Sequence, residues 1–578
     1  MPESIAIVGM GARGLSILER LVATARPDRP LVVHVIDPGP FGVGVHHEDQ
    51  PDELLLNTVA GQITVFRRGD PAAHGACVDG PSLAEWAGVE RDAYLPRRVL
   101  GAYFRDAYAR LVGAAPPSLR VAEHTTRATD ARRAPDGSWT LVLADGTRVS
   151  ADFLVLATGH GTLVPSDVDV AAEAFVRRHR DRNRALAYLR TCYPLAGLSA
   201  IARGSRVGVR GMGLSAVDVV IELTEGRGGR FEEVADGELA YRPSGAEPVI
   251  AVWSRHGRAF WPRARNEKSP ADVHRPRALH LDAVHRLRAE GPRDFTRDYV
   301  PLLQTEMRDA ADRIDPAASI SHLAGLLEVP TGRELGPAED RARALAAFFA
   351  ADERRAEAGN MTDPVKAATD AVRDLRNEIR EAVEHGGLTP QSHRVFVEVY
   401  APLLHVISAG PPALRARQWR ALLDCGILRL GPTAAAVTFD DEAARFRLLG
   451  ADGETWDCDA VVGAAVDPFL PERDNDALTR ALLAQGLGRP YRNGDYHPGG
   501  WDIDRRGRLR DAAGEPIGNL CAVGNPTEGP HYFTNMLPAP GLPSRITADA
   551  QHVVEALEEW RLAPRASSPS PIPEETVV

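Results

Sequence analysis

The sequence predicts an α/β protein in which two βαβ folds of the dinucleotide-binding kind are combined with a helical insert. Two observations carry this prediction. A short apolar strand runs into a glycine turn and then a helix twice, at residues 5–22 and again at residues 206–223, which is how such folds begin. Between residues 271 and 425 the pattern is mostly helical, and Ala, Leu, Arg and Glu predominate. We therefore expect an α/β frame that carries a helical segment.

Length and composition agree with a folded chain of several domains. The chain has 578 residues, of which 44% are hydrophobic and 25% are charged, which argues against a wholly disordered protein. The formal net charge is −11 and no long basic run is present, so no nucleic-acid partner is expected. No stretch approaches the roughly 18 apolar residues of a membrane helix, and no signal peptide pattern opens the chain. We expect a cytoplasmic protein without a membrane partner.

Cysteine and histidine patterns give no sign of metal or dithiol chemistry. The five cysteines are far apart in sequence and form no CxxC pair, so neither a dithiol relay nor a zinc site is predicted. His46 and His47 have no partner at a metal-ligand spacing. His531 is interpreted as either a flavin contact or a structural histidine. We therefore predict no metal site.

The first glycine turn predicts a Rossmann-like fold. It lies between strands 5–8 and 31–36, and its glycines are Gly9, Gly11 and Gly14. The first permits the tight turn, the second lets the backbone approach a pyrophosphate, and the third allows close packing of helix on strand. Asp37 ends the second strand, 23 residues beyond Gly14, where a carboxylate can accept hydrogen bonds from ribose hydroxyls. A purely structural glycine turn is the alternative.

The next elements continue this fold. Residues 96–111 form an amphipathic helical pattern, and residues 119–150 alternate in polarity with turn signals at 135–137 and 145–146, which favours antiparallel strands. Residues 153–157 form an apolar strand that ends at Thr158 and Gly159. In proteins with two dinucleotide folds, such a strand end marks the exit from the first fold into the second. Gly159 is therefore a candidate cofactor-binding residue.

A second glycine turn repeats the same logic. It follows strand 206–209, contains Gly211, Gly213, Ser215 and Ala216, and leads into a helix over 217–223. Ala216 replaces the third glycine, which such turns tolerate. Two folds suggest two dinucleotides, and in flavoproteins the N-terminal fold takes FAD while the inserted fold takes NAD(P)H. An unused duplicate is the alternative.

An arginine beyond a strand of the second fold can hold a 2′-phosphate. Strand 249–253 is followed by Arg255 and Arg258, which favours NADPH over NADH. Since 66 of the 68 basic residues are arginine, a solvated surface arginine is the alternative.

After residue 427 the pattern again predicts strands, at 460–466 and 520–523, and the pattern of residues 542–562 predicts a last helix. The segment that holds Gly524, Thr527 and Asn535 resembles the one whose backbone amides face the flavin pyrimidine ring. The predicted domains are an FAD-binding part (1–160), an NADPH-binding domain (161–270), a helical insert or substrate domain (271–425), a return to both dinucleotide folds (426–562) and a disordered tail (563–578).

A cationic segment joins the second fold to the helical insert. It contains Arg263, Arg265 and Lys268 beside aromatic residues, at a junction where a cleft over the flavin would form. Bidentate arginines suit a substrate with carboxylates. An ordinary basic loop is the alternative.

Four segments resemble the FAD–NAD(P)-binding family: Asp37–Gly42, Leu56–Gln62, Gly211–Asp218 and Leu223–Phe231. The resemblance spans most of the chain outside the insert and the tail. The paired folds are similar to class B flavin monooxygenases and to microbial N-hydroxylating monooxygenases. The family activity that the chain most resembles is that of the L-aspartate N-monooxygenases of cremeomycin- and fosfazinomycin-type biosynthesis, which form nitrosuccinate. The complete fingerprint of Baeyer–Villiger and related class B enzymes, FxGxxxHxxxW/F, is not found.

The resemblance implies FAD and NADPH as cofactors, and O₂ and a small amino acid, first of all L-aspartate, as substrates. NADPH reduces FAD, the reduced flavin forms a C4a-hydroperoxide, and the neutral amine attacks it; repeated oxidation leads to a nitro group. Asn57 and Gln62 are the candidates for stabilising the peroxide. The alternatives are an NAD(P)H-dependent flavoprotein reductase or dehydrogenase, an ornithine- or lysine-type side-chain N-hydroxylase, and a redox-sensing binding protein. A homo-oligomer is left open.

Overall fold

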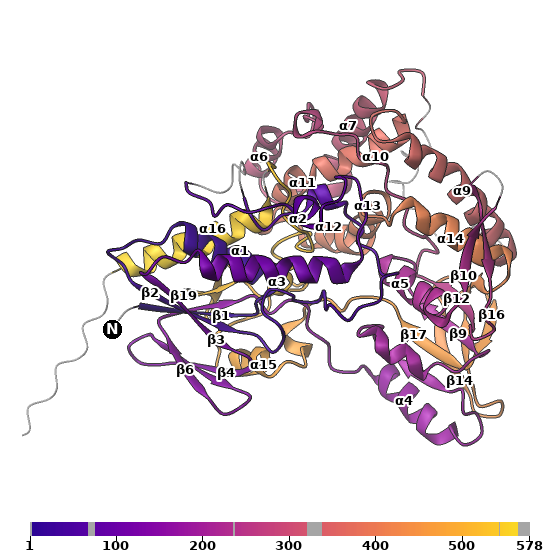
Figure 1. Ribbon diagram of the computed structural model, residues 1–578, viewed down its shortest axis with the longest axis horizontal. Coiled ribbons are helices and arrows are strands. Elements are labelled where there is room, and N and C mark those ends of the chain that lie inside the picture. Colours follow the sequence, from indigo (N-terminus) through magenta and orange to yellow (C-terminus); the bar gives the residue numbers. More distant parts are fainter. Residues whose placement is uncertain are drawn as a thin grey trace, which may run out of the picture.

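A computed structural model describes residues 3–67, 75–234, 237–318, 320, 338–542 and 544–563 (Figure 1). Within this part of the chain, two parallel sheets and a group of helices are arranged side by side, which confirms the predicted fold class. The predicted disordered tail lies outside the described residues from residue 564 onward.

The first sheet has six strands in the order β18-β19-β7-β1-β2-β3, and all but β18 run parallel. Its strands are β1 (Glu3–Val8), β2 (Leu31–Ile36), β3 (Leu119–His124), β7 (Phe153–Leu156), β18 (Arg508–Arg510) and β19 (Pro516–Ala522). One face packs in a common core with α1 (Ala12–Ala23), α2 (Leu83–Ala87), α3 (Arg97–Gly113) and α16 (Arg545–Leu562). The other face is covered by α15 (Ala477–Ala484) and by a small sheet of β4 (Ala128–Arg133), β5 (Trp139–Leu143) and β6 (Arg148–Ala151).

One strand departs from the sequence prediction. The region 119–150 was expected to be antiparallel throughout, but β3 pairs in parallel with β2, in the register Leu31↔Leu119. The reason is the chain path: α3 connects β2 to β3 as a crossover, and a crossover returns the chain as a parallel strand. Only β4, β5 and β6 form the expected antiparallel hairpins.

The second sheet has five parallel strands in the order β13-β12-β9-β17-β8. They are β8 (Ala187–Leu189), β9 (Arg206–Arg210), β12 (Val249–Trp253), β13 (Leu428–Leu430) and β17 (Ala460–Gly463). Helix α5 (Leu214–Glu222) and the hairpin of β10 (Arg230–Glu233) and β11 (Leu239–Arg242) share its main core. A smaller core contains α4 (Asp167–His179) and the sheet of β14 (Ala436–Asp440), β15 (Arg445–Leu449) and β16 (Thr455–Cys458).

Both insertions occupy crossover connections between neighbouring parallel strands. The whole second fold lies between β7 and β19, and the helical segment lies between β12 and β13. Parallel neighbours need a long connection in any case. Each insertion therefore leaves the strand order of its sheet intact.

The helical segment contains α6 (Leu281–Ala289), α7 (Val300–Asp312), α9 (Ala338–Ala358), α10 (Pro364–Asp374), α11 (Arg376–Val383), α12 (Pro390–Val395), α13 (Ala401–Ser408) and α14 (Ala413–Asp424). Most of these helices share one core of their own. In contrast, Phe349 of α9 and Trp419 of α14 are buried in the core of the second sheet. These two helices of the β12–β13 crossover therefore cover one face of the second sheet.

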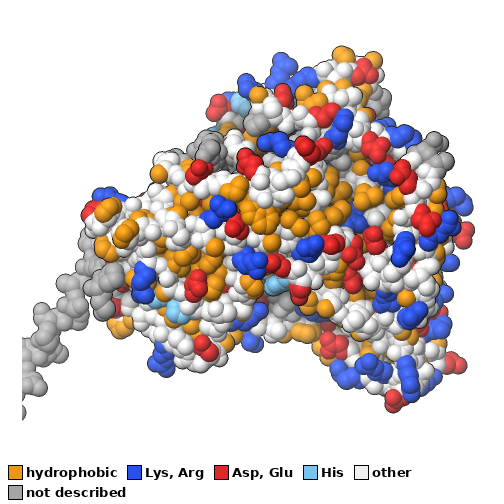
Figure 2. Space-filling model, in the orientation of Figure 1, with side chains coloured by type: hydrophobic (Ala, Val, Ile, Leu, Met, Phe, Trp, Pro, Cys, Tyr) orange, Lys and Arg blue, Asp and Glu red, His pale blue; other side chains and the backbone are white. Residues whose placement is uncertain are grey.

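None of the described helices is both long and apolar enough to cross a bilayer. On the face drawn in Figure 2, hydrophobic side chains gather across the middle, and acidic and basic side chains are interspersed around them. That face presents no extended basic surface.

Candidate active site

A cavity of about 2070 Å³ lies where the first sheet meets the helical segment. Its walls come from the first glycine turn, residues 56–62, residues 263–269, the junction of α10 and α11, and residues 533–537. Ordinary small-molecule pockets measure roughly 300–1,000 Å³. The cavity is therefore large enough for an extended dinucleotide together with a small substrate.

The first glycine turn forms an open cradle at one end of this cavity. Gly9 has a φ of +97°, and a Cβ atom there would lie 2.2 Å from the carbonyl oxygen of Ala157. A Cβ atom at Gly14 would lie 2.4 Å from the carbonyl oxygen of Gly9, so this glycine allows the close packing that was predicted. Helix α1 begins after Gly11 without a side-chain cap. Its first backbone N–H groups can therefore receive an anion.

Asp37 and Gly159 also line the cavity. The Asp37 carboxylate accepts hydrogen bonds from the backbone N–H of Met10 at 2.8 Å and of Gly39 at 2.9 Å. It thus ties the glycine turn to the end of β2, and its remaining lone pairs can accept ribose hydroxyls. Gly159 has a φ of +72° and open space where its Cβ would be. These contacts fit a dinucleotide.

The C-terminal segment contributes differently from residue to residue. Asn535 lines the cavity and is exposed to it. Thr527 is fully buried, and its hydroxyl donates to the carbonyl oxygen of Gly524 at 2.7 Å. A Cβ atom at Gly524 would lie 3.0 Å from the Arg13 side chain. Gly524 and Thr527 therefore shape the turn, while Asn535 is the one of these three predicted residues that borders the cavity.

The second glycine turn repeats the geometry of the first. The N–H of Gly211 donates to the carbonyl oxygen of Trp253 at 2.8 Å, and a Cβ at Gly211 would lie 2.3 Å from the carbonyl oxygen of Ala464. Helix α5 begins after Gly213 without a side-chain cap, and Ser215 lies in its first turn. This arrangement suits a second pyrophosphate. The turn does not line the large cavity.

The two arginines predicted to hold a 2′-phosphate follow β12, whose last residue bonds to the second glycine turn. Arg255 is exposed and Arg258 is half-buried. Burial lowers the pKa of the Arg258 guanidinium. Both arginines thus follow the end of β12, and their role in holding a 2′-phosphate stays a prediction.

The structure brings Arg263 together with Asn57 and Gln62, and all three line the cavity. The Arg263 guanidinium donates to the carbonyl oxygen of Asn57, to the Thr58 hydroxyl at 3.2 Å and to the Gln62 amide oxygen at 3.5 Å. The predicted flavin-side residues and a predicted substrate residue therefore share one wall. Beside Arg263, the Lys366 ammonium donates to the Pro262 carbonyl oxygen at 2.8 Å.

Two other predicted substrate residues are placed less favourably. Lys268 lines the cavity, but its ammonium pairs with Asp370 at 2.6 Å and Asp374 at 2.7 Å. Its charge is thus balanced by carboxylates. Arg265 is exposed, lies outside the cavity and pairs with Glu267 at 2.9 Å.

Several arginines that were not predicted as site residues also line the cavity, and three of them lie at the junction of α10 and α11: Arg373, Arg376 and Arg380. Arg373 pairs with Asp370, and Arg380 donates to the backbone carbonyl oxygens of Tyr532 and Phe533. In sequence, their spacing of three and four residues is typical of one helix face, whereas in the structure Arg373 lies on α10 and the other two lie on α11. Because arginine is abundant throughout this chain, the same spacing is expected of an ordinary solvent-exposed helix, and the sequence alone does not identify these arginines as site residues.

Arg376 differs from the other two. Within the part of the chain that the structure describes, its guanidinium makes no hydrogen bond or ion pair, and it lies over the Phe533 ring at 4.1 Å. Burial, and then Arg373 and Arg380, lower the pKa of Arg376 to about 9. Burial, and then Arg373, lower the pKa of Arg263 to about 10. Burial thus disfavours the charged form of both guanidinium groups, and a bound anion would favour it.

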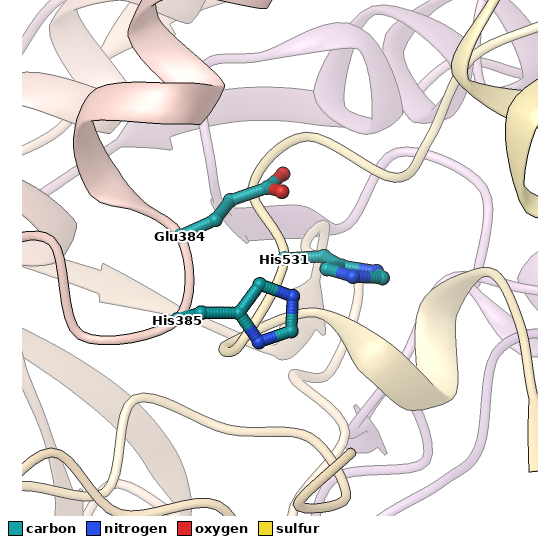
Figure 3. Close-up of side chains that lie close together, drawn as sticks. All are labelled: Glu384, His385 and His531. Atoms are coloured by element: carbon teal, nitrogen blue, oxygen red, sulfur yellow. The ribbon is translucent and has the colours of Figure 1, made fainter. Parts of the chain in front are cut away.

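A separate cluster contains Glu384, His385 and His531, whose ligand-type atoms lie within 4.8 Å of one another. Figure 3 shows the three side chains converging from the loop after α11 and from the C-terminal segment. Both Glu384 carboxylate oxygens accept from Arg545, at 2.9 and 2.8 Å. Burial, and then Arg545 and His385, lower the pKa of His531 far below its usual value. Because an arginine already compensates the carboxylate, we assign this cluster to packing and not to a cation.

Comparisons with known proteins identify the family of the chain. A family model for FAD-NAD(P)-binding matches residues 6–161. The chain is 34% identical to an L-aspartate N-monooxygenase (nitrosuccinate-forming) from Streptomyces cremeus, over 96% of this chain and 94% of that protein. It is 33% identical to the nitrosuccinic acid synthase npaA from Aspergillus oryzae, over 96% and 92%.

Among solved structures, the ornithine hydroxylase from Pseudomonas aeruginosa matches 97% of this chain and 100% of its own, with 12% identity and a TM-score of 0.44. We base no argument on that structural likeness. The sequence relatives, which cover nearly the whole chain, decide the family. The chain belongs to the family of nitrosuccinate-forming N-monooxygenases and is a flavin-dependent monooxygenase that binds FAD and NAD(P)H.

Proposed function

We propose that this protein uses NADPH and O₂ to oxidise the amine of L-aspartate towards nitrosuccinate. The observation that carries the substrate assignment is the pair Arg263 and Arg376. Both guanidinium groups line the cavity, and no carboxylate pairs with either among the described residues. The names of the sequence relatives point to the same substrate.

Charge matching favours an amino dicarboxylate over other amino acids. Each guanidinium can hold one carboxylate through two parallel N–H donors. A monocarboxylate would leave one of these two half-buried cations without a counter-charge. Ornithine and lysine would instead bring a second ammonium group among Arg263, Arg373, Arg376 and Arg380, where like charges repel.

The same cations also prepare the amine for reaction. An amine must lose a proton before its nitrogen lone pair can attack an electrophilic oxygen. Nearby positive charge lowers the pKa of an ammonium group, because it disfavours the charged form. The guanidinium groups that hold the carboxylates therefore also favour the neutral, nucleophilic amine.

The cofactors fit residues of this chain. Gly9, Gly11, Asp37, Gly159 and Asn535 would hold FAD, which when bound supplies the activation of O₂ with electrons from NADPH. Each turnover puts one oxygen atom on the substrate nitrogen and reduces the other to water, and NADPH provides the two electrons. Repeated turnovers carry the hydroxylamine on towards the nitro group.

The chain's own residues orient the reactants. Asn57 donates to the Ala409 carbonyl oxygen at 3.2 Å, which joins the first fold to the helical segment across the cavity. Gln62 and the Asn57 carbonyl oxygen accept from Arg263. We infer that this wall holds Arg263 in position to bind a substrate carboxylate. Discrimination against NADH is assigned to Arg255 and Arg258, and a cytoplasmic location is part of the proposal.

The test is a substrate panel with product analysis. Enzyme, NADPH and O₂ are incubated with L-aspartate, L-glutamate, L-ornithine or L-lysine, and N-oxidised product is sought by mass spectrometry. Reactions without NADPH and without O₂ serve as controls. We expect product from aspartate. Product from ornithine but none from aspartate would assign the enzyme to the side-chain amine hydroxylases, and NADPH oxidation without any N-oxidised product would favour a reductase.

A further inference from the structure

Phe533 occupies a strained backbone position at the cavity wall. Its φ is +56°, in the left-handed region that side chains other than glycine rarely adopt. Such conformations persist only where the surrounding structure over-determines them, and they cluster at functional sites. Phe533 lines the cavity directly.

Charged side chains from several elements hold this backbone in place. The N–H of Phe533 donates to Glu528 at 2.8 Å, and its carbonyl oxygen accepts from Arg380 at 3.0 Å. The neighbouring groups are held in the same way by Glu384, Arg380, Glu528 and Arg13. Every backbone polar group from residue 532 to residue 534 thus bonds to a charged side chain.

The restrained backbone places the Phe533 ring against the Arg376 guanidinium. The Arg376 guanidinium carbon lies 4.1 Å from the centre of the Phe533 ring, and the His405 ring lies beside it with a centroid separation of 4.9 Å. A guanidinium held over an aromatic face is stabilised by the ring electrons. Its in-plane N–H donors stay free for a carboxylate.

An aromatic partner leaves the positive charge of Arg376 uncompensated. An acidic partner would hold Arg376 equally well but would neutralise it, as Asp370 does for Arg373. The ring holds the guanidinium without adding a negative charge. It therefore preserves the cation for a ligand.

We infer that Phe533 is a positioning residue for the substrate: its strained backbone places the ring under Arg376 and presents that guanidinium to one carboxylate of a dianionic ligand. The inference rests on the proposed function only in naming this ligand an amino dicarboxylate. It assigns no role in the chemical step to Phe533.

The experiment separates the inference from the proposed function by using succinate, a dicarboxylate without an amine, as a binding probe. Its dissociation constant is measured calorimetrically with the FAD-loaded wild type and with Phe533→Leu, Arg376→Gln and the double variant. Phe533→Leu keeps the apolar volume and removes the aromatic face. Phe533→Tyr keeps the face and is the matched control.

We expect Phe533→Leu to weaken succinate binding on the order of 3- to 30-fold, the range of a partly buried cation–π contact. Phe533→Tyr should stay close to the wild type. In the Arg376→Gln background the leucine substitution should cause no further loss, because its effect acts through Arg376.

Equal succinate affinity in Phe533→Leu and the wild type would overturn the inference. So would losses that multiply in the double variant, since they would show that Phe533 acts independently of Arg376. If the leucine variant does not fold, Phe533→Gly, which accepts a positive φ, replaces it under the same expectations. Failure of the wild type to oxidise aspartate would refute the proposed function but leave this result standing.

Discussion

Replacing Arg376 with glutamine should weaken L-aspartate binding without destabilising the fold. Among the described residues the Arg376 guanidinium makes no hydrogen bond or ion pair. Its removal therefore leaves no buried partner unsatisfied. It also relieves the burial of a charged group and the repulsion from Arg373 and Arg380, which together lower the pKa of Arg376 to about 9.

The size of the effect follows from the contact that is lost. A hydrogen bond to a charged group contributes about 1.5–3 kcal/mol. Since about 1.4 kcal/mol corresponds to a factor of ten, kcat/KM for aspartate should fall on the order of 10- to 100-fold. Because a two-point clamp also orients the amine, kcat should fall together with kcat/KM. The free energy of unfolding should stay the same or rise slightly.

The assay is steady-state formation of N-oxidised product from aspartate, with thermal unfolding of the FAD-loaded protein measured in parallel. Arg286→Gln is the matched control, because Arg286 is exposed on α6 and lies outside the cavity. It should behave like the wild type in both measurements. Unchanged kcat/KM in Arg376→Gln would refute the reasoning, and so would a large loss of stability, which would show that Arg376 has a structural partner.

Three further predictions test other parts of the structure. Gly11→Val should purify with little flavin, measured as flavin absorbance per protein, because even its Cβ would lie 3.2 Å from the Gly44 Cα; full flavin content would exclude this turn as the FAD cradle. Arg258→Ala should weaken NADPH roughly 10- to 100-fold and leave NADH use unchanged, and equal use of both nucleotides by the wild type would remove the basis for this assignment. Lys366→Met should lower the free energy of unfolding by about 3–5 kcal/mol, since Lys366 and Asp352 form a fully buried pair at 2.6 Å. Lys366→Met with Asp352→Leu should regain most of that loss in denaturant titrations, and an equally unstable double variant would contradict the account.

The sequence predicted the α/β frame well because strands and glycine turns leave local signals. The strands at 31–36 and 249–253 lie where the apolar runs placed them. Gly9 and Gly211 could be found because each position forbids a side chain for the same reason: a carbonyl oxygen lies where the Cβ would be. The carbonyl oxygens belong to the distant residues Ala157 and Ala464, but the strand, the glycines and the helix of each turn are consecutive in sequence and are therefore visible in a single chain.

The remaining features depend on contacts between distant segments. The direction of β3 is set by the crossover through α3, which the alternation of polar and apolar residues does not record. Packing of α9 and α14 on the second sheet depends on the β12–β13 crossover. Neither the direction of β3 nor the packing of α9 and α14 could therefore be predicted from the sequence alone.

The candidate site shows the same division. Asn57, Gln62 and Arg263 were predicted separately, and the structure joins them on one wall. Arg265 and Lys268 looked equivalent to Arg263 in sequence, but one points outside the cavity and the other is paired with two carboxylates. Arg376 could not be singled out, because its distinguishing property is that none of the described acidic residues pairs with it in space.

The central claim is that the protein transfers oxygen from O₂ to the nitrogen of aspartate. The most direct measurement is a reaction with NADPH, L-aspartate and ¹⁸O₂, with mass spectrometry of the first N-oxidised product and simultaneous measurement of NADPH consumed. The account predicts one ¹⁸O atom on the nitrogen of the hydroxylamine for one NADPH oxidised. Flavin turnover in the presence of aspartate with no ¹⁸O in any aspartate-derived product would contradict it.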